Sequence, residues 1–275
     1  MQKIFDIHTH IYPEAIAKKA IDNLNKFYEF DKYYNFKAAG LGTVDDLISH
    51  GKEDGLCGAL LLCVATNPKQ VKAVNDFVAK QIKERSSDDF KLVGFGCMHQ
   101  DLCERDIEEE ADRIEKIGLK GIKIHPDIQG VDIDDERLMP LYEMLEGKMP
   151  IYFHIGDNRE EYNFSDPLKL KKIKKRFPRL EVVAAHLGGY SVWEQIGAII
   201  DLDDIWFDTS SALWAMDAEH AKKLIRELGT KRVMFGTDYP VAYAESELKL
   251  IDKLELDKDE LEDILYNNAK RFLEL

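Results

Sequence analysis

Short apolar segments recur along the whole chain, and a longer polar or amphipathic stretch separates each from the next. The segment CGALLLCV at 57–64 is apolar almost throughout, as expected of a parallel strand that is buried on both faces. Helix-start signals such as Asn67-Pro68 and Ser165-Asp166-Pro167 follow several of these segments. The pattern predicts eight strands, at 4–10, 57–64, 91–98, 121–126, 150–156, 181–189, 205–210 and 232–240. It predicts helices at about 43–54, 67–85, 108–118 and 134–147, a basic helix ending near 177, and two helices within 245–273.

Eight strands separated by helices favour a (β/α)8 TIM barrel, an α/β fold, formed as a single domain over residues 1–275. An open doubly wound sheet would have a glycine-rich phosphate-binding turn after its first strand, where this chain has His8-Thr9-His10. The aromatic-rich segment 27–42, between the first two strands, is either a lid over a site or packing against the barrel.

Composition narrows the classes of partner. The chain is 45% hydrophobic and 33% charged, as in ordinary globular proteins, and its net charge of −14 argues against nucleic acid as a ligand. We expect a small-molecule substrate, no membrane association and a cytoplasmic location, because no signal peptide or membrane-length apolar stretch is evident. The four cysteines form no C-x-x-C pair, so we interpret them as structural thiols.

Histidines and one aspartate close most of the predicted strands. In a parallel barrel, the groups that do chemistry gather at the carboxyl ends of the strands. A single such histidine is more often a hydrogen-bonded core residue, but a whole set at one face is hard to explain that way. The set consists of His8, His10, His125, His154, His186 and Asp238.

The spacing of the first pair suits a metal ion. Residues i and i+2 of a strand share a face, so His8 and His10 can both offer a ring nitrogen to one ion. Asp6 lies one layer deeper and is placed to orient an imidazole by accepting its other N–H. A nitrogen from His154 and a carboxylate from Asp238 would complete a mixed N/O site. We expect one divalent ion, with Zn²⁺ first and Mn²⁺, Fe²⁺ or Co²⁺ as alternatives.

The motifs that contain these residues resemble the amidohydrolase superfamily, in particular the branch that includes aminocarboxymuconate semialdehyde decarboxylase. They occur in the right order along the whole chain: D-I-H-T-H at 6–10, G-I-K-I-H-P at 121–126, F-H-I-G at 153–156, A-H-L-G-G at 185–189 and F-G-T-D-Y-P at 235–240.

The resemblance implies a (β/α)8 barrel in which four residues bind one divalent metal: His8, His10, His154 and Asp238. It implies His186 as the catalytic histidine, with Asp238 sharing proton transfer, and a homodimer as a possible assembly. Relatives with two metals often use a carboxylated lysine from the fourth strand as a bridge, but Lys123 lies two residues before His125, which predicts a position one layer too deep for that role. TatD-type nucleases also begin with D-x-H-x-H, but they carry an E-x-G-L-D element that this chain lacks.

The first functional hypothesis is a metal-dependent hydrolase in which an activated water attacks an amide, lactam, lactone or ester. The alternative is a non-oxidative decarboxylase of a small unsaturated or aromatic carboxylate. A non-catalytic metal-binding protein is the rival from another class.

Further residues are candidates for contacts with the substrate. Arg159 would clamp a carboxylate, His125 would lie close to the substrate or metal, and Asp208 would support the site from a second layer. Tyr12 and Trp214 would form walls of the pocket.

Overall fold

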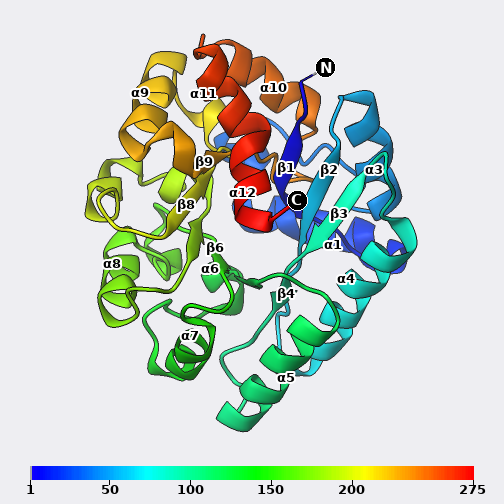
Figure 1. Ribbon diagram of the computed structural model, residues 1–275, viewed down its shortest axis with the longest axis vertical. Helices are drawn as coiled ribbons and strands as arrows, with labels where there is room; N and C mark the ends of the chain where they lie inside the picture. Colours follow the sequence, from blue (N-terminus) through cyan, green and yellow to red (C-terminus); the bar gives the residue numbers. More distant parts are fainter. Residues whose placement is uncertain (1) are drawn as a thin grey trace.

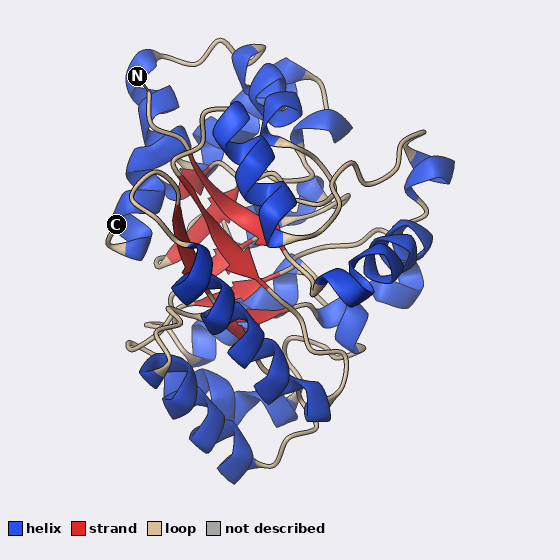
Figure 2. Ribbon diagram, turned by 90° about the vertical axis from the view of Figure 1, so that its right-hand side faces the viewer, coloured by secondary structure: helices blue, strands red, loops and turns tan. Residues whose placement is uncertain are grey.

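The computed structural model describes residues 2–275, in which short parallel strands form a central barrel surrounded by helices (Figures 1 and 2). The strands are β1 (Phe5–His10), β2 (Gly58–Leu62), β3 (Lys91–Gly94), β4 (Gly96–Cys97), β5 (Ile122–Ile124), β6 (Ile151–Phe153), β7 (Val182–Ala184), β8 (Ile205–Asp208) and β9 (Val233–Met234). Every neighbouring pair is parallel. Phe95 interrupts the predicted third strand, so that β3 and β4 together occupy one position of the barrel.

Two seams join the strands into a closed ring. At one seam, Phe95 N–H donates to Leu61 O at 3.0 Å, and Gly96 N–H donates to Gly121 O at 2.8 Å. At the other, a parallel bridge between Thr9 and Tyr239 joins the first strand to the chain that follows β9. The predicted (β/α)8 barrel is therefore confirmed as the fold.

The helices are α1 (Glu14–Tyr28), α2 (Phe30–Tyr33), α3 (Val44–Glu53), α4 (Val71–Arg85), α5 (Glu104–Lys116), α6 (Pro126–Gln129), α7 (Met139–Leu145), α8 (Pro167–Arg176), α9 (Ala218–Leu228), α10 (Ala244–Asp252), α11 (Lys258–Glu262) and α12 (Asn268–Leu273). Much of the polar stretch after the first strand proves to be α1. Helix α5 begins four residues before its predicted start, and three helices, not two, follow residue 243. Within residues 2–275, no helix has both the length and the apolarity needed to cross a membrane.

Successive side chains of a strand point alternately outward and inward, so they fall into an outer apolar layer and a separate cluster inside the barrel. On β6, Ile151 and Phe153 pack in the layer between strands and helices, whereas Tyr152 joins the cluster inside. Helix α12 packs beside the starts of the strands, where the Phe272 ring lies 5.5 Å from that of Trp206, and Figure 1 shows it across the front of the barrel. The opposite end, where the strands finish, holds the polar groups described next.

Gly58 provides a test of how closely the first strands pack. A Cβ at this position would lie 2.3 Å from the carbonyl oxygen of Lys91 and 2.7 Å from the Phe5 ring. We expect Gly58→Ala to destabilise the protein by about 1–3 kcal/mol, the usual cost of overpacking. Thermal unfolding would show this as a melting temperature lower by several degrees. Gly197→Ala is the control, because nothing lies within 4 Å of its added methyl group; equal melting temperatures for the two variants would contradict the packing described.

Candidate active site

Two imidazoles from β1 face each other at the mouth of the barrel. Their Nε2 atoms, on His8 and His10, lie 3.1 Å apart. His8 Nδ1 lies 3.2 Å from the carboxylate of Asp208, and His10 Nδ1 lies 2.9 Å from the carbonyl oxygen of Leu62. Because an acceptor faces each Nδ1, that nitrogen carries the proton and each Nε2 presents a lone pair. Burial lowers the pKa of His8 to about 4, which keeps its ring neutral.

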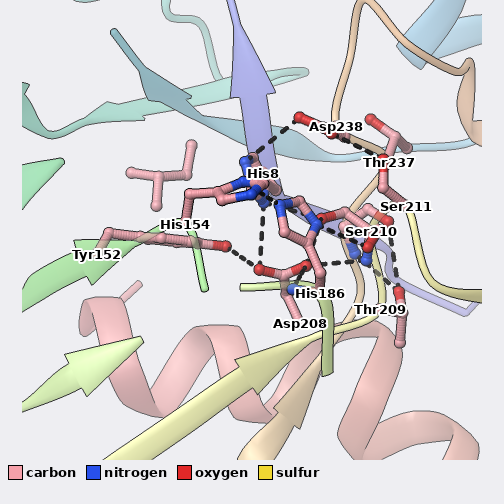
Figure 3. Close-up of polar contacts among 12 residues, drawn as sticks. His8, Tyr152, His154, His186, Asp208, Thr209, Ser210, Ser211, Thr237 and Asp238 are labelled. Carbon is pink, nitrogen blue, oxygen red and sulfur yellow. Dashed lines mark hydrogen bonds and ion pairs between the residues drawn. The ribbon is translucent and has the colours of Figure 1, made fainter. Parts of the chain in front are cut away.

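Asp238 brings a third acceptor to the same point (Figure 3). Its Oδ1 lies 3.4 Å from His8 Nε2 and 3.3 Å from His10 Nε2, while Ser211 Oγ donates to its Oδ2 at 2.7 Å. Burial raises the pKa of Asp238, whereas positive charge on the neighbouring histidines would lower it well below its usual range; with those rings neutral, that charge has to come from a cation.

Two lone pairs and a carboxylate oxygen thus converge with no hydrogen between them. Such a group repels itself unless a cation lies among the three atoms. Their separations of 3.1, 3.3 and 3.4 Å match the edge of roughly 3.3 Å expected around a tetrahedral ion with bonds of about 2.0–2.1 Å. The donor set formed by His8, His10 and Asp238 therefore fits a divalent metal ion.

Asp208, at the end of β8, holds this arrangement from below. Its carboxylate accepts hydrogen bonds from the Tyr152 hydroxyl at 2.6 Å and from the Ser210 N–H at 2.8 Å, besides its contact with His8 (Figure 3). Burial would raise the pKa of Asp208, but His8, His186 and the Ser210 hydroxyl hold it well below its usual range. The supporting position predicted for Asp208 matches this geometry.

Asp6 has different contacts from those predicted. Its carboxylate accepts the backbone N–H of His8 at 3.0 Å, and the backbone N–H and hydroxyl of Thr237 at 3.1 and 2.6 Å. The prediction that Asp6 orients an imidazole ring is therefore wrong. It ties β1 to the chain after β9, and its burial raises its pKa to about 7. A carboxylate from across the barrel, Asp208, contacts the His8 ring instead.

His154 and His186 lie beside the first pair. His154 Nδ1 is 2.9 Å from His186 Nε2, and the His186 ring stacks on that of His8 at 5.1 Å. His154 Nε2 faces two acceptors, Gly156 O at 3.0 Å and Asp127 Oδ2 at 3.2 Å. The proton of His154 therefore resides on Nε2, which leaves the Nδ1 lone pair directed toward the histidine cluster.

His154, the predicted fourth ligand, lies in the same pocket but slightly apart. Among residues 2–275, the ligand atoms of His8, His10 and Asp238 lie within 4.8 Å of one another, and His154 falls in a neighbouring group with His125 and Asp127.

Lys123 lies inside the barrel beneath the site. Its ammonium nitrogen is 4.6 Å from the centre of the Tyr152 ring and has no hydrogen-bond partner within residues 2–275. Burial lowers the pKa of Lys123 to about 8.

A pocket of about 280 Å³ opens above the histidines. Its walls come mainly from α1 and from the ends of β1 and β2, and its lining side chains outside the histidine and aspartate cluster are all neutral. They are Tyr12, Ala20, Asn23, Leu24, Phe27, Tyr28, Leu62, Cys63, Val64, Thr66 and Ile128. The predictions that Tyr12 forms a wall and that His125 faces the pocket agree with this lining.

Arg159 and Trp214 do not line this pocket. The Nε and Nη2 atoms of Arg159 donate to the Asp157 carboxylate at 2.9 and 2.6 Å, and Nη1 donates to Phe27 O at 2.6 Å. Trp214 packs edge-on against Tyr34, with ring centres 4.6 Å apart. In the segment 27–42, Phe27 and Tyr28 line the pocket and the later aromatics pack together, which agrees with the packing alternative.

Two further residues of the site were not predicted from the sequence: Asp127, which contacts His154 next to the pocket, and Tyr28, which lines the pocket. Asp127 follows His125 by two residues, and its nearness to a candidate histidine was the available signal. Tyr28 ends α1, and its hydroxyl lies 2.8 Å from His125 Nε2. Only the aromatic content of its segment pointed to it.

Comparison with known proteins yields a curated relative and several solved structures. The 2-amino-3-carboxymuconate-6-semialdehyde decarboxylase of Dictyostelium discoideum is 25% identical over 242 residues, which is 74% of this chain. The match covers 66% of that relative, slightly less than two thirds of its length.

The solved structures share the fold over nearly the whole chain. An uncharacterised TIM-barrel protein from Bordetella bronchiseptica has a TM-score of 0.81 at 21% identity and covers 99% of this chain and 98% of its own. A dihydroxybenzoic acid decarboxylase from Polaromonas, solved with manganese and the inhibitor 2-nitroresorcinol, has a TM-score of 0.72 at 16% identity and covers 100% of this chain and 98% of its own. Decarboxylases of 5-carboxyvanillate and 2,6-dihydroxybenzoate have similar folds as well.

A protein-family model described as amidohydrolase matches residues 6–275, which is almost the entire chain. The match includes both histidines of β1 and the aspartate that follows β9. The chain therefore belongs to this amidohydrolase family, within the amidohydrolase superfamily.

Proposed function

We propose that this protein is a metal-dependent decarboxylase of a small aromatic or unsaturated carboxylate, and that one barrel domain spanning residues 1–275 carries the activity. The observation that carries the proposal is the convergence of two imidazole lone pairs and a carboxylate oxygen, 3.1–3.4 Å apart, at the base of a neutral pocket.

Four residues would hold the ion: His8, His10, Asp238 and, through Nδ1, His154. Imidazole nitrogen with carboxylate oxygen suits Zn²⁺ or Mn²⁺. When bound, such an ion neutralises and polarises a substrate carboxylate or a neighbouring oxygen.

The pocket favours a small, flat, largely apolar substrate. Its volume of about 280 Å³ is at the lower end of the range for ligand pockets, which is roughly 300–1,000 Å³. Leu24, Phe27, Leu62, Val64 and Ile128 offer apolar surface for one unsaturated ring or chain. The relatives named as decarboxylases, two of them of hydroxylated benzoic acids, support the same substrate class.

Decarboxylation needs one proton for each turnover. The bond between the carboxylate and the substrate carbon breaks, CO₂ leaves, and the electron pair that stays on the carbon takes up a proton. Asp238 and His186 are the titratable groups of the pocket placed to move that proton, since both line it beside the converging acceptors. The neutral walls exclude water, which would otherwise compete as the proton source.

Hydrolysis of a small carbonyl compound is the second candidate, favoured by the ionised state of Asp238. A carboxylate held ionised beside the ion site can accept the proton of an attacking water. The same residues would serve both reactions, and the neutral, largely apolar pocket together with the decarboxylases among the related structures supports decarboxylation as the first proposal.

The deciding experiment uses purified protein stripped with a chelator and reloaded with Mn²⁺ or Zn²⁺. The protein is incubated with hydroxybenzoates and unsaturated monocarboxylates, and with neutral lactones and amides as the second arm. We expect metal-dependent release of CO₂ from a member of the first arm with no consumption of water. Hydrolysis in the second arm without CO₂ from the first would replace the decarboxylase proposal with the hydrolase.

Replacing His186 by Asn tests its role in proton transfer. We expect His186→Asn to keep its metal, because its ring is not among the converging acceptors, and to lose about 10²–10⁴-fold in turnover. Metal content by mass spectrometry and the CO₂ assay check this. His220→Asn, which changes an exposed imidazole on α9, is the matched control. Loss of metal from His186→Asn would show that His186 is a ligand.

Replacing Asp208 by Asn tests the support of His8. The amide can no longer fix the proton on His8 Nδ1 as a carboxylate does, so we expect metal affinity to fall by about 10–100-fold. Titration of the stripped protein with Mn²⁺ measures the affinity. Asp203→Asn removes an exposed carboxylate that precedes the same strand and should bind Mn²⁺ as the wild type does. Equal affinity in both variants would remove Asp208 from the metal site.

A further inference from the structure

Tyr28 brings a hydroxyl group to the pocket from outside the barrel strands. It is the last residue of α1, is only 8% exposed, and lines the pocket beside His125 and His154. Its Oη lies 2.8 Å from His125 Nε2, and this is its one hydrogen-bond partner in residues 2–275. Burial raises the pKa of Tyr28 well above its usual value, so the hydroxyl keeps its proton.

The direction of this hydrogen bond follows from the other nitrogen of His125. That nitrogen, Nδ1, accepts the backbone N–H of Ile128 at 3.4 Å as the N-terminal cap of α6. A neutral imidazole that accepts at Nδ1 carries its proton on Nε2. His125 therefore donates to the Tyr28 oxygen, and the Tyr28 hydroxyl hydrogen is free to donate elsewhere. The open space beside it is the pocket.

The end of α1 is held firmly enough to place this group. Arg159 donates to Phe27 O at 2.6 Å while Asp157 fixes its guanidinium with two hydrogen bonds. The same guanidinium carbon lies 5.5 Å from the centre of the Tyr28 ring. The Tyr28 ring also stacks on that of Phe30, with ring centres 5.3 Å apart. Both hydrogen bonds and ring contacts therefore restrict where the hydroxyl can point.

We propose that Tyr28 donates its hydroxyl hydrogen to a substrate oxygen in the pocket, and that His125 orients it by donating to the phenolic oxygen. The inference rests on the proposed function and narrows its substrate class. The substrate would be a single ring with two polar groups. Its carboxylate would face His8, His10 and Asp238, and a hydroxyl or oxo group would face Tyr28. The remaining walls, all neutral, accommodate the apolar edge of the ring.

Binding of two related ligands to the manganese-loaded protein tests this assignment without relying on turnover. One ligand is 2-nitroresorcinol, the inhibitor bound by the Polaromonas decarboxylase, and the other is 2-nitrophenol, which lacks one hydroxyl. Titration calorimetry compares the wild type, Tyr28→Phe and Tyr34→Phe. Tyr34 is the matched control, because its hydroxyl belongs to the same aromatic cluster but contacts Ser191 outside the pocket.

We expect Tyr28→Phe to lower the affinity for 2-nitroresorcinol by about tenfold or more, the usual effect of losing a hydrogen bond to a charged oxygen. The affinity for 2-nitrophenol should fall much less. Tyr34→Phe should bind both ligands as the wild type does, and Mn²⁺ affinity should be the same in all three proteins. Comparing the two ligands isolates the hydroxyl contact, as a double-mutant cycle does for a residue pair.

Equal weakening of the two ligands by Tyr28→Phe would overturn the inference and leave the proposed function standing, because it would show a packing role only. A wild-type protein that binds Mn²⁺ but neither ligand would overturn the substrate class itself, and the assignment of Tyr28 with it.

Discussion

The structure is organised around the mutual repulsion of three acceptors. Nε2 of His8, Nε2 of His10 and Oδ1 of Asp238 face one another at 3.1–3.4 Å with no proton to share. A hydrogen bond on the far side holds each of them: His8 donates to Asp208, His10 donates to Leu62 O, and Asp238 accepts from Ser211. Several buried polar contacts thus hold together an arrangement that is unfavourable by itself and becomes favourable when a cation binds.

Much of this site could be predicted from the sequence because it depends on local rules. Strand periodicity places His8 and His10 on one face, and the parallel barrel brings the carboxyl ends of distant strands together. His125, His154, His186 and Asp238 all line one pocket for that reason. Those two rules are independent of side-chain packing, which explains why they succeed with a single sequence.

The predictions that failed concern the hydrogen-bond partners of individual side chains. Asp6 shares a strand with His8, so spacing favoured it as the support of the ring, but Asp208 lies closer although it is 200 residues away. Arg159 has the chemistry of a carboxylate clamp, yet the neighbouring Asp157 satisfies its guanidinium first. Tyr28 enters the pocket from a helix whose docking no strand pattern describes. Which partner a side chain contacts depends on the packed structure, because the distances to competing hydrogen-bond partners are fixed only there.

The seam that closes the barrel also separates the two halves of the acceptor cluster. His8 and His10 lie on the first strand, and Asp238 lies in the chain beyond the last. The two are joined by the Thr9–Tyr239 bridge, a few backbone hydrogen bonds and the contacts of Asp6 with Thr237. An ion shared by these residues would act as a clasp between opposite ends of the chain. Loss of the ion would remove one link across this joint, so that metal binding would add to the stability of the closed barrel.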